Sequence, residues 1–248
     1  MIIKNITMKR LLLLTTILFS LNSGFAQFDQ LKKAAGGVKD IFSPKKDSLS
    51  SGTVVDGLKE ALNKGIENGT KQLSAVDGFF GNAALKILMP PEAQQVESSL
   101  RKVGLGNQVD EAILNMNRAA EDACKTAAPI FINAIKNMNI SDAFGILRGG
   151  DRAATDYLQK NTNTELTNSF RPVIETALNK IDATKHWNTI FTNYNRFSFN
   201  KVNPDLAAYV TEKALSGIFY QLALEEQKIR KDPAAQTTEL LKKVFGGK

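Results

Sequence analysis

The sequence predicts an all-α fold: a single, bundle-like domain of several helices, preceded by a flexible N-terminal tether. Apolar residues recur every three or four positions from Thr53 to Phe245, which is the period of an amphipathic helix. The chain contains no alternating apolar pattern long enough to build a sheet. Its 248 residues are 43% hydrophobic and 23% charged, which is ordinary for a globular protein and excludes a disordered or multi-span membrane protein.

The first 26 residues have the three parts of a secretory signal. A basic start is followed by the uncharged run Leu11–Leu21, and the small residues Gly24 and Ala26 stand three and one positions before the expected cleavage point. The apolar run is about half of the roughly 20 residues that a bilayer-spanning helix needs, so a cleaved signal is favoured over an anchor. Cleavage after Ala26 leaves Gln27 first, and since Gln27 is not cysteine, the protein is not expected to be a lipoprotein. The sequence therefore predicts a periplasmic or secreted protein without a stable membrane span after cleavage.

A polar, basic segment separates this signal from the helical region. Residues 27–51 contain Gly36-Gly37 and Ser43-Pro44, a composition that is typical of a flexible tether. The all-α domain is expected to span residues 52–248.

The first predicted helix carries a stripe of small residues beside its apolar face. Each glycine in a helix interior costs about 1 kcal/mol relative to alanine, a cost that close approach of another helix offsets. Tight internal packing is favoured over a dimer face, and an assembly role for this stripe is the alternative. The apolar positions are Val55, Leu58, Leu62, Ile66 and Leu73, and the stripe is Gly57, Ala61, Gly65 and Gly69.

A loop interrupts the helical pattern between the first and second helices. Val76–Pro91 contains two glycines, two phenylalanines and a double proline. Pro91 suits the first turn of a helix that is expected to run to about Val103. The glycines at 104 and 106 do not complete a nucleotide-binding pattern, so Asn107 is expected to cap the next helix.

The next helix is predicted to be about 30 residues long and to be kinked by Pro129. Cys124 lies on its apolar stripe and is interpreted as a small core residue. The stripe consists of Val109, Ile113, Met116, Ala120, Cys124, Ala127, Phe131, Ala134 and Met138.

Capping signals predict where the following helices begin. Ser141 is expected to cap a short helix that ends at Gly149-Gly150, and Asp151 is able to cap the next one. The capping box Thr162–Glu165 predicts a further helix start.

Two proline signals predict the last helices. Asn203-Pro204-Asp205 opens a helix at about 204–231, and Asp232-Pro233 opens another at about 233–245.

The usual catalytic and cofactor motifs are missing, and we expect no cofactor, metal site or catalytic residue. The chain has one cysteine, which excludes an internal disulfide, and one histidine, His186, which lies on a predicted aromatic helix face of core spacing. Glu225 and Glu226 are neighbours on a helix, so their side chains diverge by about 100° and are interpreted as a solvated face. The net charge is +7, and it is +4 without the first 26 residues, which is too weak to predict nucleic-acid binding.

Two polar groups do not fit a simple helical core. Asn117, Arg118 and Glu121 lie in the middle of the long apolar helix, where buried groups need partners. Near Gly149-Gly150, free N–H groups at a helix start are able to bind an anion. We predict that the first group packs against Ser141–Tyr157. The candidate ligand site or polar network is Asn117, Arg118, Glu121, Asp142, Gly149, Gly150, Asp151, Thr155 and Tyr157.

Several stretches of the sequence, in the same order, resemble the bacterial family catalogued as domain of unknown function 4197. The resemblance covers about residues 50–247 and implies an exported envelope protein, and it implies no reaction. It is carried by DGFFGNAALKILMP at 77–90, VGLGNQVDEAILNMNRAAEDA at 103–123, PIFINAIKNMNISDAFGILRGGDRAATDYL at 129–158 and TTELLKKVFGG at 237–247.

Three functions remain open at this point. The first is a non-catalytic binding or accessory protein for a small apolar or amphipathic ligand, or for a protein partner in the envelope. The second is a structural or assembly protein that uses the glycine stripe. The third is a hydrolase-like enzyme that uses Glu121, Asp151 and Arg118.

Overall fold

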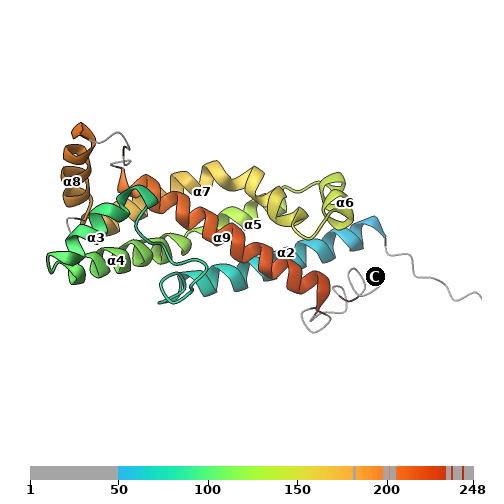
Figure 1. The fold of residues 1–248 in the computed structure, drawn as a ribbon. Coiled ribbons are helices and arrows are strands. Elements are labelled where there is room, and N and C mark those ends of the chain that lie inside the picture. The colour runs from blue at the N-terminus through green and yellow to red at the C-terminus, as the bar shows by residue number, and fades with distance from the viewer. Residues whose placement is uncertain are drawn as a thin grey trace, which may run out of the picture. The chain divides into compact units, whose positions relative to one another are not determined.

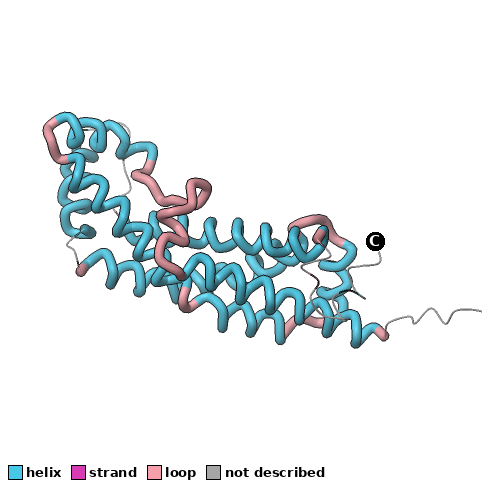
Figure 2. The backbone as a smooth tube through the Cα atoms, turned by 90° about the horizontal axis from the view of Figure 1, so that it is seen from below, coloured by secondary structure: helices cyan, strands magenta, loops and turns pink. Residues whose placement is uncertain are grey.

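The computed structural model describes residues 50–180, 183–197 and 205–232, together with residues 201, 236 and 242. The predicted signal at 1–26, nearly all of the tether and the helix expected at 233–245 lie outside these ranges. The described residues belong to one compact unit, Leu49–Lys248. They form helices and loops without any strand, which confirms the all-α prediction for this part of the chain (Figures 1 and 2). The helices are α2 (Ser51–Ser74), η1 (Pro91–Ala93), α3 (Gln94–Lys102), α4 (Gly106–Cys124), α5 (Ala127–Lys136), α6 (Ile140–Arg148), α7 (Ala153–Asn179), α8 (Ala183–Phe197) and α9 (Leu206–Lys231).

Helix α9 is the central element of this unit. It packs against α2, α4 and α7, while α5 packs against α2 and α7 (Figure 1). Asp205 caps α9 by accepting a hydrogen bond from the Ala208 N–H at 2.9 Å. The helix therefore starts at Leu206, two residues later than predicted, because Asp205 provides the cap.

The small-residue stripe of α2 packs against α9. A Cβ added at Gly69 would lie 3.3 Å from Leu222 Cδ2, and one at Gly65 would lie 3.5 Å from Glu225 Cβ. Both glycines are buried in this contact, so close helix packing offsets their conformational cost. The prediction of tight internal packing is confirmed at these two positions, and the stripe does not form an open dimer face there.

Helices α3 and α4 form a hairpin whose turn differs from the prediction. Gly104 has a φ of +84°, and the Leu105 N–H bonds back to the Leu100 carbonyl at 2.9 Å. This is a Schellman-type helix end, which requires a residue such as glycine in the left-handed region. Leu105 is the N-cap residue of α4, so the prediction that Asn107 caps this helix is wrong.

The expected 30-residue helix is divided into two helices. α4 ends at Cys124, a turn follows, and α5 begins at Ala127. Pro129 therefore lies in the first turn of α5, where its missing N–H removes no helix hydrogen bond. The proline starts a second helix instead of kinking a continuous one.

Two further capping predictions are corrected. Asn139, not Ser141, caps α6, in a capping box with Asp142. The segment Thr162–Glu165 lies inside α7, because Thr162 is buried and its hydroxyl donates to the Leu158 carbonyl at 2.7 Å. Tertiary burial thus overrides a local capping signal at this position.

Helix α8 lies with α3 at one end of the helical unit (Figure 1). Trp187 and Phe191 are buried, and their ring centroids are 4.2 Å apart. Within the described residues, no helix is both long enough and apolar enough to cross a membrane.

Candidate functional site

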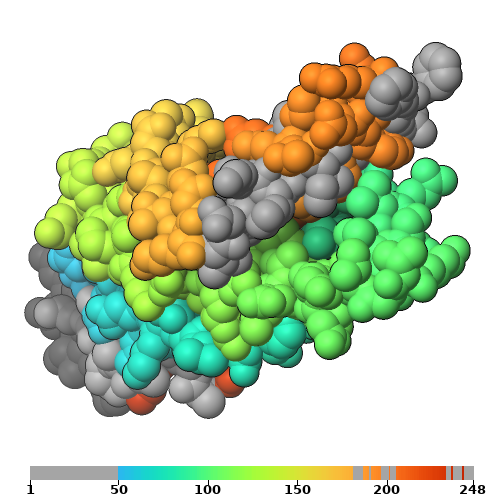
Figure 3. Space-filling view, turned by 90° about the vertical axis from the view of Figure 1, so that its left-hand side faces the viewer, coloured from blue at the N-terminus to red at the C-terminus, as the bar shows by residue number. Residues whose placement is uncertain are grey.

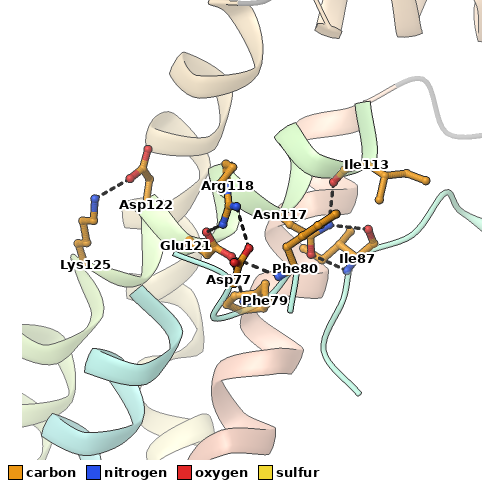
Figure 4. Close-up of polar contacts among 10 residues, drawn as sticks. All are labelled: Asp77, Phe79, Phe80, Ile87, Ile113, Asn117, Arg118, Glu121, Asp122 and Lys125. Atoms are coloured by element: carbon orange, nitrogen blue, oxygen red, sulfur yellow. Dashed lines mark hydrogen bonds and ion pairs between the residues drawn. The ribbon is translucent and has the colours of Figure 1, made fainter. Parts of the chain in front are cut away.

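The polar residues of α4 hold the loop between α2 and η1, residues 75–90, against the helix (Figures 2 and 4). Glu121 is buried, and its Oε1 accepts hydrogen bonds from the backbone N–H groups of Phe79 at 3.0 Å and Phe80 at 3.2 Å. Its Oε2 accepts a bond from Arg118 at 2.7 Å. The carboxylate therefore satisfies two loop amides and one guanidinium at once.

Arg118 extends this contact to the beginning of the loop. It donates to Asp77 at 2.8 Å, and Asp77 has a φ of +68°, a conformation that aspartate tolerates better than most residues. The hydrogen bond to Glu121, followed by the bond to Asp77, raises the pKa of Arg118. The guanidinium thus joins the buried carboxylate to an exposed one.

Asn117 binds the far end of the same loop. Its Oδ1 accepts the Ile87 N–H at 2.8 Å, and its Nδ2 donates to the Ile87 carbonyl at 2.8 Å and to the Ile113 carbonyl at 2.7 Å. The amide is completely buried and satisfies both backbone groups of Ile87, as a neighbouring strand would. We call the contacts of Asn117, Arg118 and Glu121 with residues 77–87 the loop clasp.

The ring of Phe79 shows how deeply the loop is inserted. Phe79 is completely buried, and a Cβ added at Gly217 of α9 would lie 2.5 Å from its Cε1 atom. Gly217 thus leaves the space that the ring occupies. The prediction that Asn117, Arg118 and Glu121 pack against Ser141–Tyr157 is wrong, because this returning loop supplies their partners.

A second polar cluster lies at the start of α7. Glu226 of α9 is buried and accepts hydrogen bonds from the Ala154 N–H at 3.0 Å and from the Thr155 N–H at 2.9 Å and hydroxyl at 2.8 Å. The helix start therefore binds an anion, as the free N–H groups suggested, but the anion is a side chain of the same protein. The interpretation of Glu226 as part of a solvated face is wrong, and Glu225 is buried as well.

Arg230 completes this cluster. It pairs with Glu226 at 2.8 Å and donates to the Ile146 carbonyl at 2.9 Å, so it binds an acceptor near the end of α6. Gly149 is crowded here, since an added Cβ would lie 2.5 Å from the Ala153 Cβ, whereas Gly150 has open space around it. The cluster joins the α6–α7 turn to α9.

The remaining predicted site residues have local roles around α6 and α7. Asp142 belongs to the α6 capping box, in which its own N–H donates to Asn139 Oδ1 at 2.8 Å. Asp151 pairs with Lys231, whose hydrogen bond is the main cause of the lowered pKa of Asp151. Burial raises the pKa of Tyr157, and the charge of Asp142 and a hydrogen bond to it raise it further.

The two polar clusters are far apart. Phe79, which binds Glu121, packs at Gly217, whereas Asp151 pairs with Lys231. Gly217 and Lys231 are separated by fourteen residues of α9, which corresponds to about 21 Å along the helix axis. The structure therefore does not bring Glu121 and Asp151 together on one substrate.

A pocket with a mainly apolar lining lies between α3, α4, α8 and the start of α9. It has a volume of about 470 Å³ and includes Val96, Leu100, Val109, Trp187 and Phe191 in its lining. Figure 3 views this end of the unit, with α8 in orange on one side of the hollow and the α3–α4 hairpin in green on the other.

The rim of this pocket is polar. Glu97 of α3 and Gln108, Glu111 and Asn115 of α4 line it beside the apolar groups. Sequence reasoning missed this site, since Val109, Met116 and the aromatic face of α8 have the spacing of core residues. The polar residues of the rim form no sequence motif that would distinguish the edge of a pocket from the solvent-exposed side of a helix.

The cysteine of the chain lies inside the core. Cys124 is completely buried, as predicted for a core residue, and burial followed by the charge of Glu121 raises the pKa of its thiol. No cluster of three or more His, Cys, Asp or Glu side chains in the described ranges is placed to hold a metal ion.

The fold and these sites define an all-helical protein with two internally satisfied polar clusters and a lateral apolar pocket. The chain belongs to the family described as "Protein of unknown function (DUF4197)", whose model matches residues 48–246. This match confirms the resemblance found in the sequence and covers nearly the same region. No curated protein and no solved structure matches the chain.

Proposed function

We propose that this protein binds a small amphipathic molecule in the pocket between α3, α4, α8 and α9. The observation that carries the proposal is the lining, which combines buried apolar side chains with hydrogen-bonding groups at the rim. The volume of about 470 Å³ falls in the range of roughly 300–1,000 Å³ that is typical of small-molecule sites. A ligand with an apolar body and a polar end matches this division.

The energetic argument follows from the residues inside the pocket. Val96 and Leu100 are half-buried and Leu105 is exposed, so they present apolar surface to the pocket. Burying a ligand against this surface contributes about 25 cal/mol per Å² of area removed from water. Gln108 and Asn115 offer amide donors and acceptors to the polar end. Hydrogen-bonding groups confined to the rim suit holding a ligand better than attacking it, which favours a binding role over hydrolysis.

Export is the second part of the proposal. The signal-like residues 1–26 support a mature protein that acts in the periplasm or outside the cell, where it would carry amphipathic molecules. N-terminal sequencing and intact mass of the exported protein test this directly, with Gln27 expected as the first residue. A mature protein that retains Leu11–Leu21 contradicts it.

The binding site has a built-in reporter, because Trp187 is the single tryptophan of the chain. We suggest titrating the exported protein with the hydrophobic dye N-phenyl-1-naphthylamine and exciting Trp187. Saturable dye emission through energy transfer, with quenching of Trp187, is the expected result. Mass spectrometry of small molecules that co-purify from the native compartment then identifies the natural ligand.

A pocket-filling variant and a matched control make the test specific. Ala112→Phe places a ring at the half-buried lining of the pocket, and Ala84→Phe adds the same ring at an exposed loop position outside it. Ala112→Phe should weaken dye binding at least tenfold while keeping the helical circular dichroism spectrum, and Ala84→Phe should bind like the wild type. Undiminished binding by a folded Ala112→Phe variant contradicts the proposal, as does a wild type that binds no dye.

A further inference from the structure

The charged groups that line the pocket are all acidic. Glu97 reaches it from α3 and Glu111 from α4, and no lysine or arginine belongs to the described lining. Lys102, at the end of α3, lines a neighbouring hollow instead. The charged part of the rim that the polar end of a ligand is able to meet is therefore acidic, beside the neutral amides of Gln108 and Asn115.

The guanidinium that pairs with Glu97 does not neutralise this rim. Arg101 pairs with Glu97 at 2.9 Å and with Asp110 at 2.8 Å, so one positive charge serves two negative ones. The hydrogen bonds to Asp110 and then to Glu97 raise the pKa of Arg101, and burial lowers it by less. Glu111 has no ion-pair partner within the described residues. The group formed by Glu97, Arg101, Asp110 and Glu111 thus carries a net charge of −2, which Lys102, in a hollow that Glu97 and Arg101 also line, reduces to −1.

From this rim, and resting on the proposed function, we infer that the ligand is a cationic amphiphile, an alkyl chain or ring system that ends in an amine or a quaternary ammonium group. The apolar lining takes the hydrophobic part, and Glu111 with the Glu97 side of the rim faces the positive end. An anionic amphiphile such as a fatty acid would bring a carboxylate next to two others, which is repulsive.

The charge of the whole chain acts in the opposite direction, which makes the inference easy to test. The formal net charge is +7, and +4 after loss of the first 26 residues, so long-range attraction favours anions. A preference for cations therefore cannot come from the net charge. This separates the inference from a general electrostatic effect.

The experiment compares two ligands with ten-carbon chains, decyltrimethylammonium and decanoate, below the concentrations at which they form micelles. Displacement of N-phenyl-1-naphthylamine and the emission of Trp187 report binding to the full exported chain. At low salt, decyltrimethylammonium should bind about fivefold more tightly than decanoate, the size expected of one exposed charge pair. The preference should shrink in high salt, because added ions screen exposed charges.

Charge variants then locate the effect. Glu111→Lys should reverse the preference, and Glu111→Gln should reduce it. The matched control is Glu165→Lys, an exposed position of α7 that does not line the pocket but changes the net charge by the same amount. Glu165→Lys should keep the wild-type preference.

The outcomes distinguish this inference from the proposed function. Equal or tighter binding of decanoate by the wild type overturns the cationic assignment while leaving the pocket a binding site. A reversal caused equally by Glu165→Lys also overturns it, since net charge would then be the cause. Failure of both ligands and of the dye to bind the wild type overturns the proposed function itself.

Discussion

The two halves of α4 lie in opposite kinds of environment. The half from Asn117 to Cys124 is sealed by the loop clasp, in which Glu121 and Asn117 are each bound to two or more groups. The half from Gly106 to Met116 borders a pocket whose lining is mainly apolar. One continuous helix thus contributes both a closed polar junction and an open apolar site.

This difference shows what polar residues in an apolar pattern signify in this fold. Burying a carboxylate or an amide is costly unless it is hydrogen-bonded, so such residues come with partners from the same chain. An apolar side chain needs no specific partner and loses only dispersion contacts when it faces a cavity. The polar residues that stand out in the sequence, Asn117, Arg118 and Glu121, are thus bound by groups of the same chain, whereas the candidate ligand site lies among residues of ordinary core spacing.

The largest expected effect on stability comes from a comparison of Glu121 with Glu111, two glutamates of the same helix. Glu121→Ala removes the acceptor of the Phe79 and Phe80 amides and leaves Arg118 without its buried partner. The variant should lower the free energy of unfolding by about 3 kcal/mol. Glu111→Ala, at the exposed rim, should change it by less than about 0.5 kcal/mol.

Urea denaturation followed by far-UV circular dichroism measures both variants. Glu121→Gln sharpens the result, because its amide oxygen still accepts the loop N–H groups while the charge that pairs with Arg118 is lost. Its stability should lie between those of the wild type and Glu121→Ala. Similar losses for Glu121→Ala and Glu111→Ala would remove the distinction between the two halves of α4.

Two of the asparagines of α4, Asn117 and Asn115, give the next largest effect. Asn117→Ala leaves both backbone groups of Ile87 without their side-chain partner in a buried position, which should cost about 2 kcal/mol. Asn115→Ala, at the rim of the pocket, should cost less than about 0.5 kcal/mol and should act on ligand binding instead. Thermal denaturation and dye titration of both variants decide whether stability and binding separate in this way.

Much of the fold could be predicted from the sequence because helical periodicity is a local property. The course of α2, the loop before Pro91 and the core position of Cys124 follow from spacing alone. Helix ends were less predictable. Asn139 competes with Ser141 for the start of α6, and burial keeps Thr162 inside α7, so tertiary contacts decide between equivalent local signals.

The candidate sites depend on contacts that spacing does not encode. Glu121 binds amides 42 and 41 residues away, and Glu226 binds the start of α7 across more than 70 residues. The sequence indicated that Glu121 needs partners but not which segment supplies them. The pocket could not be predicted for a different reason. Val109 and Trp187 have the same spacing in the sequence whether their side chains face packed neighbours or a hollow.

The smallest expected effect concerns Tyr209, which lies where the clasped loop reaches the pocket. Its hydroxyl donates to the Leu88 carbonyl at 2.8 Å, and the next residue, Met89, lines the pocket. Burial, and then the charges of Glu92 and Glu212, raise the pKa of Tyr209 to about 12. An exposed tyrosine in the unfolded chain has a pKa of about 10.

The sign of the pH dependence follows from this difference in pKa. Below about pH 10 the phenol of Tyr209 is neutral in the folded and in the unfolded chain, and its contribution to stability is fully present. Between about pH 10 and 12 the phenol ionises in the unfolded chain but not yet in the folded one, which favours unfolding. Tyr209→Phe lacks the hydrogen bond and should be less stable than the wild type by about 1 kcal/mol at pH 8. This gap should close as the pH rises through 10 towards 12, because only the wild type loses the Tyr209 contribution. Urea denaturation of both proteins from pH 8 to 11 measures this difference in the free energy of unfolding. The other tyrosines titrate in both proteins, so their effect cancels in the difference. A difference that stays constant over this range would show that the neutral Tyr209 hydroxyl does not hold the loop at the pocket.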